Sequence, residues 1–185
     1  MNLPNKITLF RVFMIPVFLF IYLARPFEAE AVNTWLALVL FSVAAITDAL
    51  DGYLARKMKL VTNFGKLMDP LADKLLVCSA LVAFVASGTL PVWAVIIMIS
   101  REFYISGLRQ LAVEQNIVLA ASNGAKFKTI AQIVLIIYLI LPFRALVFEP
   151  VVWGLIIVSI VASVLTAVDY TVKNMSIFSS GSEQP

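Results

Sequence analysis

Six apolar stretches, each near the length that crosses a lipid bilayer, constrain the fold of this chain more than any other feature. A spanning helix needs about 20 mostly apolar residues to cross a hydrocarbon core of about 30 Å. The stretches cover approximately Ile7–Ala24, Thr34–Leu54, Pro70–Ser87, Val92–Leu111, Lys128–Leu141 with its flanks, and Val151–Val168. The sequence therefore predicts an all-α, polytopic membrane protein with six transmembrane helices after a short amino-terminal interfacial segment.

Short connections join these stretches, and Pro, Gly or charged residues mark them at Arg25-Pro26, Ser87–Pro91 and Leu141-Pro142. No long linker suggests a second folded unit, so we expect a single domain over residues 1–178. Residues 179–185 are polar and small, and they predict a disordered tail.

The basic residues gather on one side of the predicted membrane. With a cytoplasmic amino terminus, the opposite side keeps only Arg25 and Arg144 among the Lys and Arg side chains that flank the spans. This asymmetry follows the positive-inside rule, and an even number of spans returns the carboxyl terminus to the same side. We therefore expect a multi-pass protein of the cell membrane with both termini in the cytoplasm.

Composition excludes several kinds of site. The chain has no His and a single Cys, Cys78, which excludes zinc sites built on Cys and His, haem ligation by His, and His-based nucleophilic catalysis. A metal ion must then be held by oxygen, which favours hard cations such as Mg²⁺ or Mn²⁺. The net charge of +3 is modest, and we expect membrane lipids but no nucleic acid as partners.

Four aspartates lie where the second apolar stretch ends and the third begins. Asp48 and Asp51 are three residues apart, and Asp69 and Asp73 are four residues apart. These spacings place each pair on one face of a helix. If the two helices form a hairpin, the four carboxylates converge near the membrane surface, where their mutual repulsion favours bound polyvalent cations.

Residues between the two pairs are suited to a phosphorylated ligand. Gly52 lets a ligand or another helix approach the backbone closely, and Arg56, one turn later, can pair with phosphate. Thr62 and Gly65 lie in the connection, where a bound nucleotide can touch a hydroxyl and the main chain. An isolated D-x-x-D is more typical of a solvated helix end, and an ion carrier also uses intramembrane carboxylates.

The string from Asp48 to Asp73 resembles the signature of the CDP-alcohol phosphotransferase family, D-x-x-D-G-x-x-A-R-x8-G-x-x-x-D-x-x-x-D. Every fixed position is matched, by Asp48, Asp51, Gly52, Ala55, Arg56, Gly65, Asp69 and Asp73. The resemblance implies a six-helix homodimeric membrane enzyme with CDP-diacylglycerol as donor. It also implies two divalent ions held by the four aspartates, with Asp73 as both ligand and catalytic base.

The amino-terminal string Leu3–Arg11 also resembles this family, whose members commonly begin P-N-x-x-T-x-x-R. This resemblance implies that Asn5 and Thr8 contact the nucleotide of CDP-diacylglycerol. The alternative is a polar interfacial segment before the first span.

A second set of cations points to an acceptor that carries its own phosphate. Arg101 and Arg109 are eight residues apart, near one helix face, and Lys126 and Lys128 begin the fifth stretch. These cations exceed the one Arg in the signature, which favours glycerol 3-phosphate over choline or ethanolamine. Residues 100–132 also resemble the branch of the family that uses glycerol 3-phosphate. Lys126 and Lys128 are individually typical of cations that bind anionic headgroups.

The predicted function is transfer of a phosphatidyl group from CDP-diacylglycerol to glycerol 3-phosphate, giving phosphatidylglycerophosphate and CMP. Inositol phosphate or serine stays open as the acceptor of the same chemistry. A membrane prenyltransferase, which also uses two aspartate-rich helical motifs, and a carboxylate-based ion carrier are the alternatives from other classes.

Overall fold

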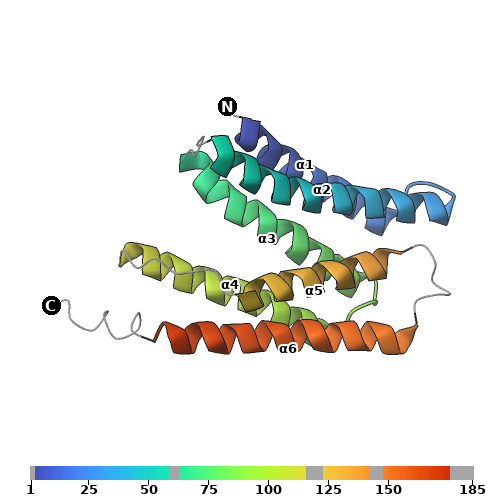
Figure 1. The fold of residues 1–185 in the computed structure, drawn as a ribbon. Coiled ribbons are helices and arrows are strands. Elements are labelled where there is room, and N and C mark those ends of the chain that lie inside the picture. The colour runs from blue at the N-terminus through green and yellow to red at the C-terminus, as the bar shows by residue number, and fades with distance from the viewer. Residues whose placement is uncertain (1–2, 59–62, 116–122, 142–147, 176–185) are drawn as a thin grey trace. The chain divides into compact units, whose positions relative to one another are not determined.

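The structure is a computed structural model, and it describes residues 3–58, 63–115, 123–141 and 148–175 (Figure 1). Within these ranges, side chains are described except at residues 3–5, 48–58, 63–70, 73 and 123. The described part of the chain forms helices without any strand, which confirms the all-α prediction. The helices are α1 (Leu3–Ala24), α2 (Glu30–Met58), α3 (Asn63–Ala86), α4 (Val92–Glu114), α5 (Asn123–Ile140) and α6 (Glu149–Lys173).

Among the described residues, three segments are long and apolar enough to cross a membrane, namely Lys6–Ala24, Glu30–Thr47 and Glu149–Lys173. A shorter apolar segment covers Lys74–Ala86 in α3. These helices confirm a polytopic membrane protein, while the count of six spans stays a prediction. Helix α4 carries charged residues from Arg101 onward, which lowers its overall apolarity.

The chain divides into two compact units. The first contains Met1–Leu90 and Ile136–Phe148, and the second contains Pro91–Leu135 and Glu149–Pro185. Helix α5 therefore contributes its first part to the second unit and its last turn to the first.

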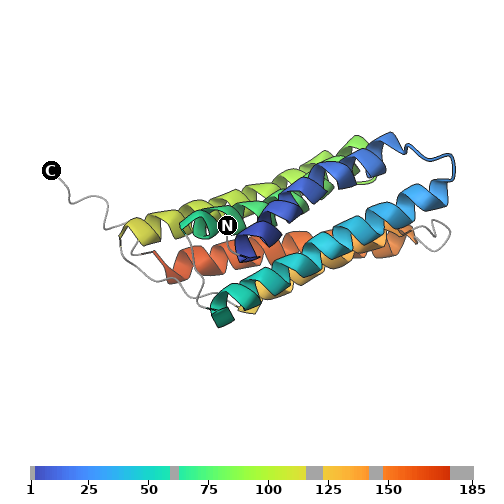
Figure 2. The same ribbon diagram turned by 90° about the horizontal axis from the view of Figure 1, so that it is seen from above.

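In the first unit, α1 packs against both α2 and α3, and α2 also contacts α3. Aromatic side chains fill this core: the Phe18 ring lies 5.8 Å from that of Phe41, and Tyr22 meets Phe84 edge to face at 5.2 Å. Helix α2 runs opposite to α1 and α3, as both ribbon views show (Figures 1 and 2). The start of α1, the end of α2 and the start of α3 therefore lie at one end of this unit.

Two turns fall where the sequence predicted them, and Pro142 of the third predicted turn lies outside the described residues. Arg25 adopts a positive φ of 46° just after α1 and precedes Pro26, which cannot continue the helix hydrogen bonds. Gly88, with φ 72°, turns the chain after α3, and the amide of Thr89 donates to the Phe84 carbonyl at 2.8 Å. Glycine suits this position because it has no Cβ to clash at positive φ.

In the second unit, α4 and α6 lie side by side and run in the same direction (Figures 1 and 2). Ile105 and Leu108 of α4 form a buried cluster with Tyr170 of α6. Helix α6 also buries small and hydroxyl-bearing residues, Ser159, Ala162, Ser163 and Thr166. Small residues at such an interface let two membrane helices approach closely.

Candidate active site

The four signature aspartates lie on helical backbone at one end of the first unit. Asp48 and Asp51 belong to the last turns of α2, and Asp69 and Asp73 belong to the first turns of α3. The backbone is helical at all four positions, so each pair has the helical spacing that the sequence predicted. Because α2 and α3 run in opposite directions, their joined ends bring the two pairs to the same end (Figure 1).

The neighbouring signature residues follow the same backbone. Gly52 and Arg56 are helical in α2, and Gly65 is helical in α3 instead of lying in the connection. Thr62 lies outside the described residues. The described residues of the signature therefore lie on two helix ends.

The four aspartates are the candidate metal ligands at this end of the first unit. Among the described side chains, no group of three or more His, Cys, Asp or Glu residues can hold a metal ion. The side chains of the four signature aspartates lie outside that set. Four carboxylates on two adjoining helix ends form a donor set that suits hard divalent cations.

The start of α1 lies at the same end as the aspartates. The predicted interfacial residues from Leu3 to Lys6 form the first turn of α1, so Asn5 is helical. Thr8 and Arg11, three residues apart on one face of α1, are fully buried. The sequence analysis did not assign Arg11, although a cation inside an apolar span was a signal for it. Arg11 is thus a buried cation in the first half of α1, and the start of this helix lies at the end that carries the four aspartates.

In the second unit, two of the predicted acceptor cations meet at one carboxylate. Arg101 Nη1 lies 3.3 Å from Glu102 Oε1, and Lys128 Nζ donates to the same oxygen. The side chains of Arg101, Glu102 and Lys128 are 9%, 15% and 3% exposed. Helices α4 and α5 thus join Arg101 and Lys128 in one nearly buried ionic cluster, which we call the Glu102 triad.

Helix α6 supplies polar partners to the arginines of α4. Arg101 Nη2 donates to Thr166 Oγ1 at 2.9 Å. Arg109 is exposed, with its guanidinium carbon 5.8 Å from the centre of the Tyr170 ring and its Nε 3.4 Å from the Tyr170 hydroxyl. Lys126 is exposed and makes no ion pair in the described part of the chain.

Thr166 and Tyr170 contact the predicted acceptor arginines, and the sequence alone did not indicate either residue. Their types are ordinary in an apolar span, and a stretch that matches only in hydropathy gives no signal to separate them from packing residues. Glu102 carried a stronger signal, because a carboxylate inside an apolar helix needs a partner.

Several buried polar atoms of the second unit have spare hydrogen-bonding capacity. Arg101 Nε, Gln132 Nε2, Ser159 Oγ and Ser163 Oγ are buried and have no hydrogen-bond partner among the described residues. Gln132 follows Lys128 by one turn, so both lie on one face of α5. Buried donors normally find a partner, so this region is suited to receive a polar group.

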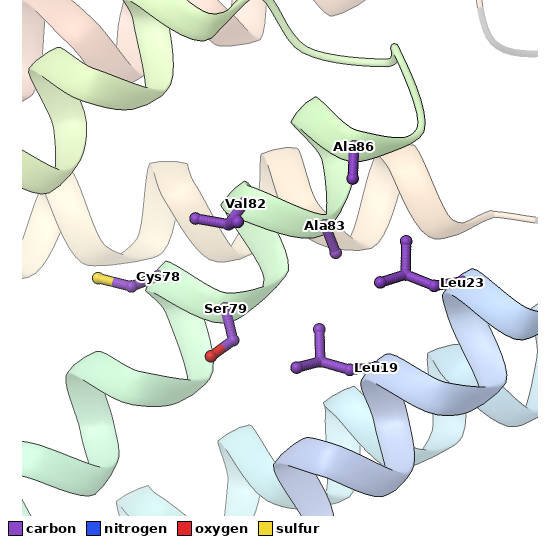
Figure 3. Close-up of a pocket in the computed structure, with 7 residues that line it drawn as sticks. All are labelled: Leu19, Leu23, Cys78, Ser79, Val82, Ala83 and Ala86. Carbon is purple, nitrogen blue, oxygen red and sulfur yellow. The ribbon is translucent and has the colours of Figure 1, made fainter.

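An apolar groove opens between α1 and α3 of the first unit. Its volume is about 300 Å³, and Ser79 and Cys78 carry the only heteroatoms among its lining side chains (Figure 3). The lining residues are Leu19, Leu23, Cys78, Ser79, Val82, Ala83 and Ala86. Such a lining is suited to a hydrocarbon chain and not to a charged ligand.

Comparisons with known proteins all indicate one family. Residues 1–168 match the family described as CDP-alcohol phosphatidyltransferase. A Bacillus subtilis (strain 168) protein named CDP-diacylglycerol--glycerol-3-phosphate 3-phosphatidyltransferase is 47% identical over 159 residues, covering 80% of this chain and 82% of that protein. A Mycobacterium tuberculosis (strain CDC 1551 / Oshkosh) protein named probable phosphatidylglycerophosphate synthase is 38% identical over 174 residues, covering 93% and 81%. A Rickettsia typhi protein with the same name as the Bacillus protein is 37% identical over 140 residues, covering 76% of each chain.

Proposed function

The chain belongs to the CDP-alcohol phosphatidyltransferase family, and on this premise we propose that it transfers the phosphatidyl group of CDP-diacylglycerol to glycerol 3-phosphate. The products are phosphatidylglycerophosphate and CMP, which places the enzyme in anionic phospholipid biosynthesis. The observation that carries the proposal is the pair of helix ends with the complete aspartate signature. Relatives named for this reaction align over most of their own length and support the choice of acceptor.

The four aspartates are suited to divalent metal ions, on which this family generally depends. We assign two ions, Mg²⁺ or Mn²⁺, to Asp48, Asp51, Asp69 and Asp73, because a chain without His offers carboxylates as its strongest ligands. When bound, these ions neutralise the pyrophosphate of the donor and the charge that develops on the departing CMP.

The reaction itself is a displacement at phosphorus. A hydroxyl oxygen of glycerol 3-phosphate attacks the lipid-side phosphorus of CDP-diacylglycerol, the bond from this phosphorus to the CMP oxygen breaks, and Asp73 accepts the hydroxyl proton. Residues of the same end bind the donor: Gly52 leaves room at the backbone, and Arg56 pairs with phosphate. Asn5, Thr8, Thr62 and Gly65 complete the proposed donor site.

The acceptor phosphate binds to Arg101, Arg109, Lys126 and Lys128 in this proposal. Support comes from the second unit, where Arg101 and Lys128 share one carboxylate and Arg109 lies against Tyr170. A guanidinium beside an ammonium matches the charge of a phosphate better than either cation alone.

The membrane setting follows from the same proposal. The apolar groove between α1 and α3 is suited to an acyl chain of the donor, because its lining is apolar. We assign the enzyme to the cell membrane, with the aspartates and both termini facing the cytoplasm. A homodimer and a single domain over residues 1–178 remain predictions.

An acceptor panel tests the function directly. Purified protein in detergent is given CDP-diacylglycerol with glycerol 3-phosphate, inositol phosphate, serine or no acceptor, and CMP release is measured with and without Mg²⁺ or Mn²⁺. We expect metal-dependent release with glycerol 3-phosphate. Release with inositol phosphate alone would overturn the acceptor, and no release with any alcohol would overturn the enzyme class.

The Asp73→Asn variant tests the proposed base. It keeps the size of the side chain but cannot take up the hydroxyl proton, so CMP release should fall to background while the protein still folds and inserts. Asp169→Asn is the matched control, because Asp169 forms an exposed ion pair with Lys173. CMP release by Asp73→Asn at the rate of the unmodified protein would exclude Asp73 as base or essential ligand.

A further inference from the structure

We propose that Glu102 is a positioning residue of the acceptor site, whose carboxylate holds Arg101 of α4 and Lys128 of α5 where both bind one phosphate. This inference rests on the proposed function and extends it, because Glu102 is not part of the aspartate signature and carries no metal in the proposal.

The geometry places Glu102 between two helices. Its Oε1 atom accepts from Lys128 Nζ and lies 3.3 Å from Arg101 Nη1, although Lys128 is 26 residues away along the chain. The Lys128 side chain is 3% exposed, and such burial of an ammonium requires a charged partner. Glu102 therefore fixes the place of Lys128 relative to Arg101.

The carboxylate of the Glu102 triad lies between two cations of different helices. Without it, the two cations would repel each other. The carboxylate offsets this repulsion, so Arg101 and Lys128 can both face one phosphate.

A purely structural bridge between α4 and α5 is the alternative, and two observations disfavour it. A bridge needs only one cation, whereas Glu102 engages two. Arg101 also keeps a buried Nε with no partner among the described residues, although Thr166 and Glu102 occupy its other nitrogens. A buried charged donor without a partner is costly, which fits a guanidinium that completes its hydrogen bonds with a ligand.

The Glu102→Gln variant tests the proposal, because it keeps the shape of the side chain and removes its charge. We expect the KM for glycerol 3-phosphate to rise about tenfold, the effect of losing one charge-assisted hydrogen bond. The inhibition constant of inorganic phosphate should rise in parallel, while the KM for CDP-diacylglycerol changes less than about twofold. Asp169→Asn, in the exposed pair with Lys173, should change none of these values.

The melting temperature of Glu102→Gln in detergent, read beside both KM values, separates positioning from structural bridging. If Glu102 only joins the helices, the variant loses stability and the KM values for both substrates rise together. If Glu102 positions cations, the KM for glycerol 3-phosphate rises more than the KM for CDP-diacylglycerol, whatever the melting temperature.

The outcomes distinguish this inference from the proposed function. Equal rises of both substrate KM values in Glu102→Gln overturn the positioning role while the reaction stands. If the unmodified protein releases CMP only with an alcohol that carries no phosphate, the proposed acceptor fails and the positioning role fails with it. If Glu102→Gln does not fold, Glu102→Asp, which keeps the charge and shortens the side chain, is measured in the same way, and its ratio of KM values decides.

Discussion

The Thr166→Val variant tests whether the acceptor site depends on the contact between α4 and α6. Thr166 is 8% exposed, and its Oγ1 accepts from Arg101 Nη2 at 2.9 Å and donates to the Ala162 carbonyl at 2.6 Å. Valine has a similar volume, so the change removes the hydroxyl and leaves little cavity. Arg101 then keeps Glu102 as its described partner and has two unpaired nitrogens where it had one.

The size of the effect follows from this contact. A hydrogen bond to a charged group contributes about 1.5–3 kcal/mol, and each 1.4 kcal/mol is about a factor of ten in affinity. If the whole loss falls on acceptor binding, the KM for glycerol 3-phosphate rises about 10-fold to 100-fold. Part of the loss falls on folding, because the buried guanidinium is also unpaired in the free enzyme, so we expect a rise near the lower value.

CMP release at varied glycerol 3-phosphate and fixed CDP-diacylglycerol measures this effect. Thr171→Val is the matched control, because Thr171 lies on the same helix and its hydroxyl pairs with the neutral Tyr104 hydroxyl at 2.9 Å. The control should keep the KM for glycerol 3-phosphate within about twofold of the unmodified value. A hydrogen bond between two neutral hydroxyls contributes less than one to a charged group, and Thr171 contacts no predicted acceptor cation. An unchanged or lowered KM in Thr166→Val would refute the reasoning, because Arg101 would then not depend on α6.

Two further pairs of variants test the remaining contacts. Arg109→Gln should raise the KM for glycerol 3-phosphate more than the KM for CDP-diacylglycerol. Tyr170→Phe keeps the ring beneath the Arg109 guanidinium, so it should raise the KM for glycerol 3-phosphate less. Equal changes of both KM values in Arg109→Gln would indicate a structural role. Phe84→Ala removes a fully buried ring that meets Tyr22 edge to face, and it should destabilise the protein by about 3–5 kcal/mol, read as a lower melting temperature in detergent. The exposed Phe103→Ala should lower the melting temperature far less, and equal losses would contradict the assigned core of the first unit.

The apolar stretches predicted the helices better than they predicted their ends. Helix α2 continues to Met58 and α3 begins at Asn63, both beyond the apolar limits at Leu54 and Pro70. Apolarity marks the part of a helix that lipid or protein surrounds, whereas backbone hydrogen bonding decides where the helix stops. The aspartate signature lies in part on these polar helical extensions.

The amino-terminal residues show that local sequence does not predict which side chains are buried. Asn5 and Thr8 were assigned from a resemblance, and the structure adds that Thr8 and Arg11 are fully buried on α1. Burial depends on which helices cover that face, and no periodicity within α1 contains this information. The sequence could place Arg11 inside an apolar span but could not state that protein surrounds it.

The sequence by itself determined the helical pairs Asp48/Asp51 and Asp69/Asp73, because their spacing is a matter of local helix geometry. Only the tertiary structure decided the partners of the charged residues: Glu102 accepts from Lys128 of α5, and Arg101 donates to Thr166 of α6. These choices depend on how each helix is rotated about its axis and where it crosses its neighbour. Local sequence fixes the order of side chains on a helix face, while packing between helices selects the residue that the face meets.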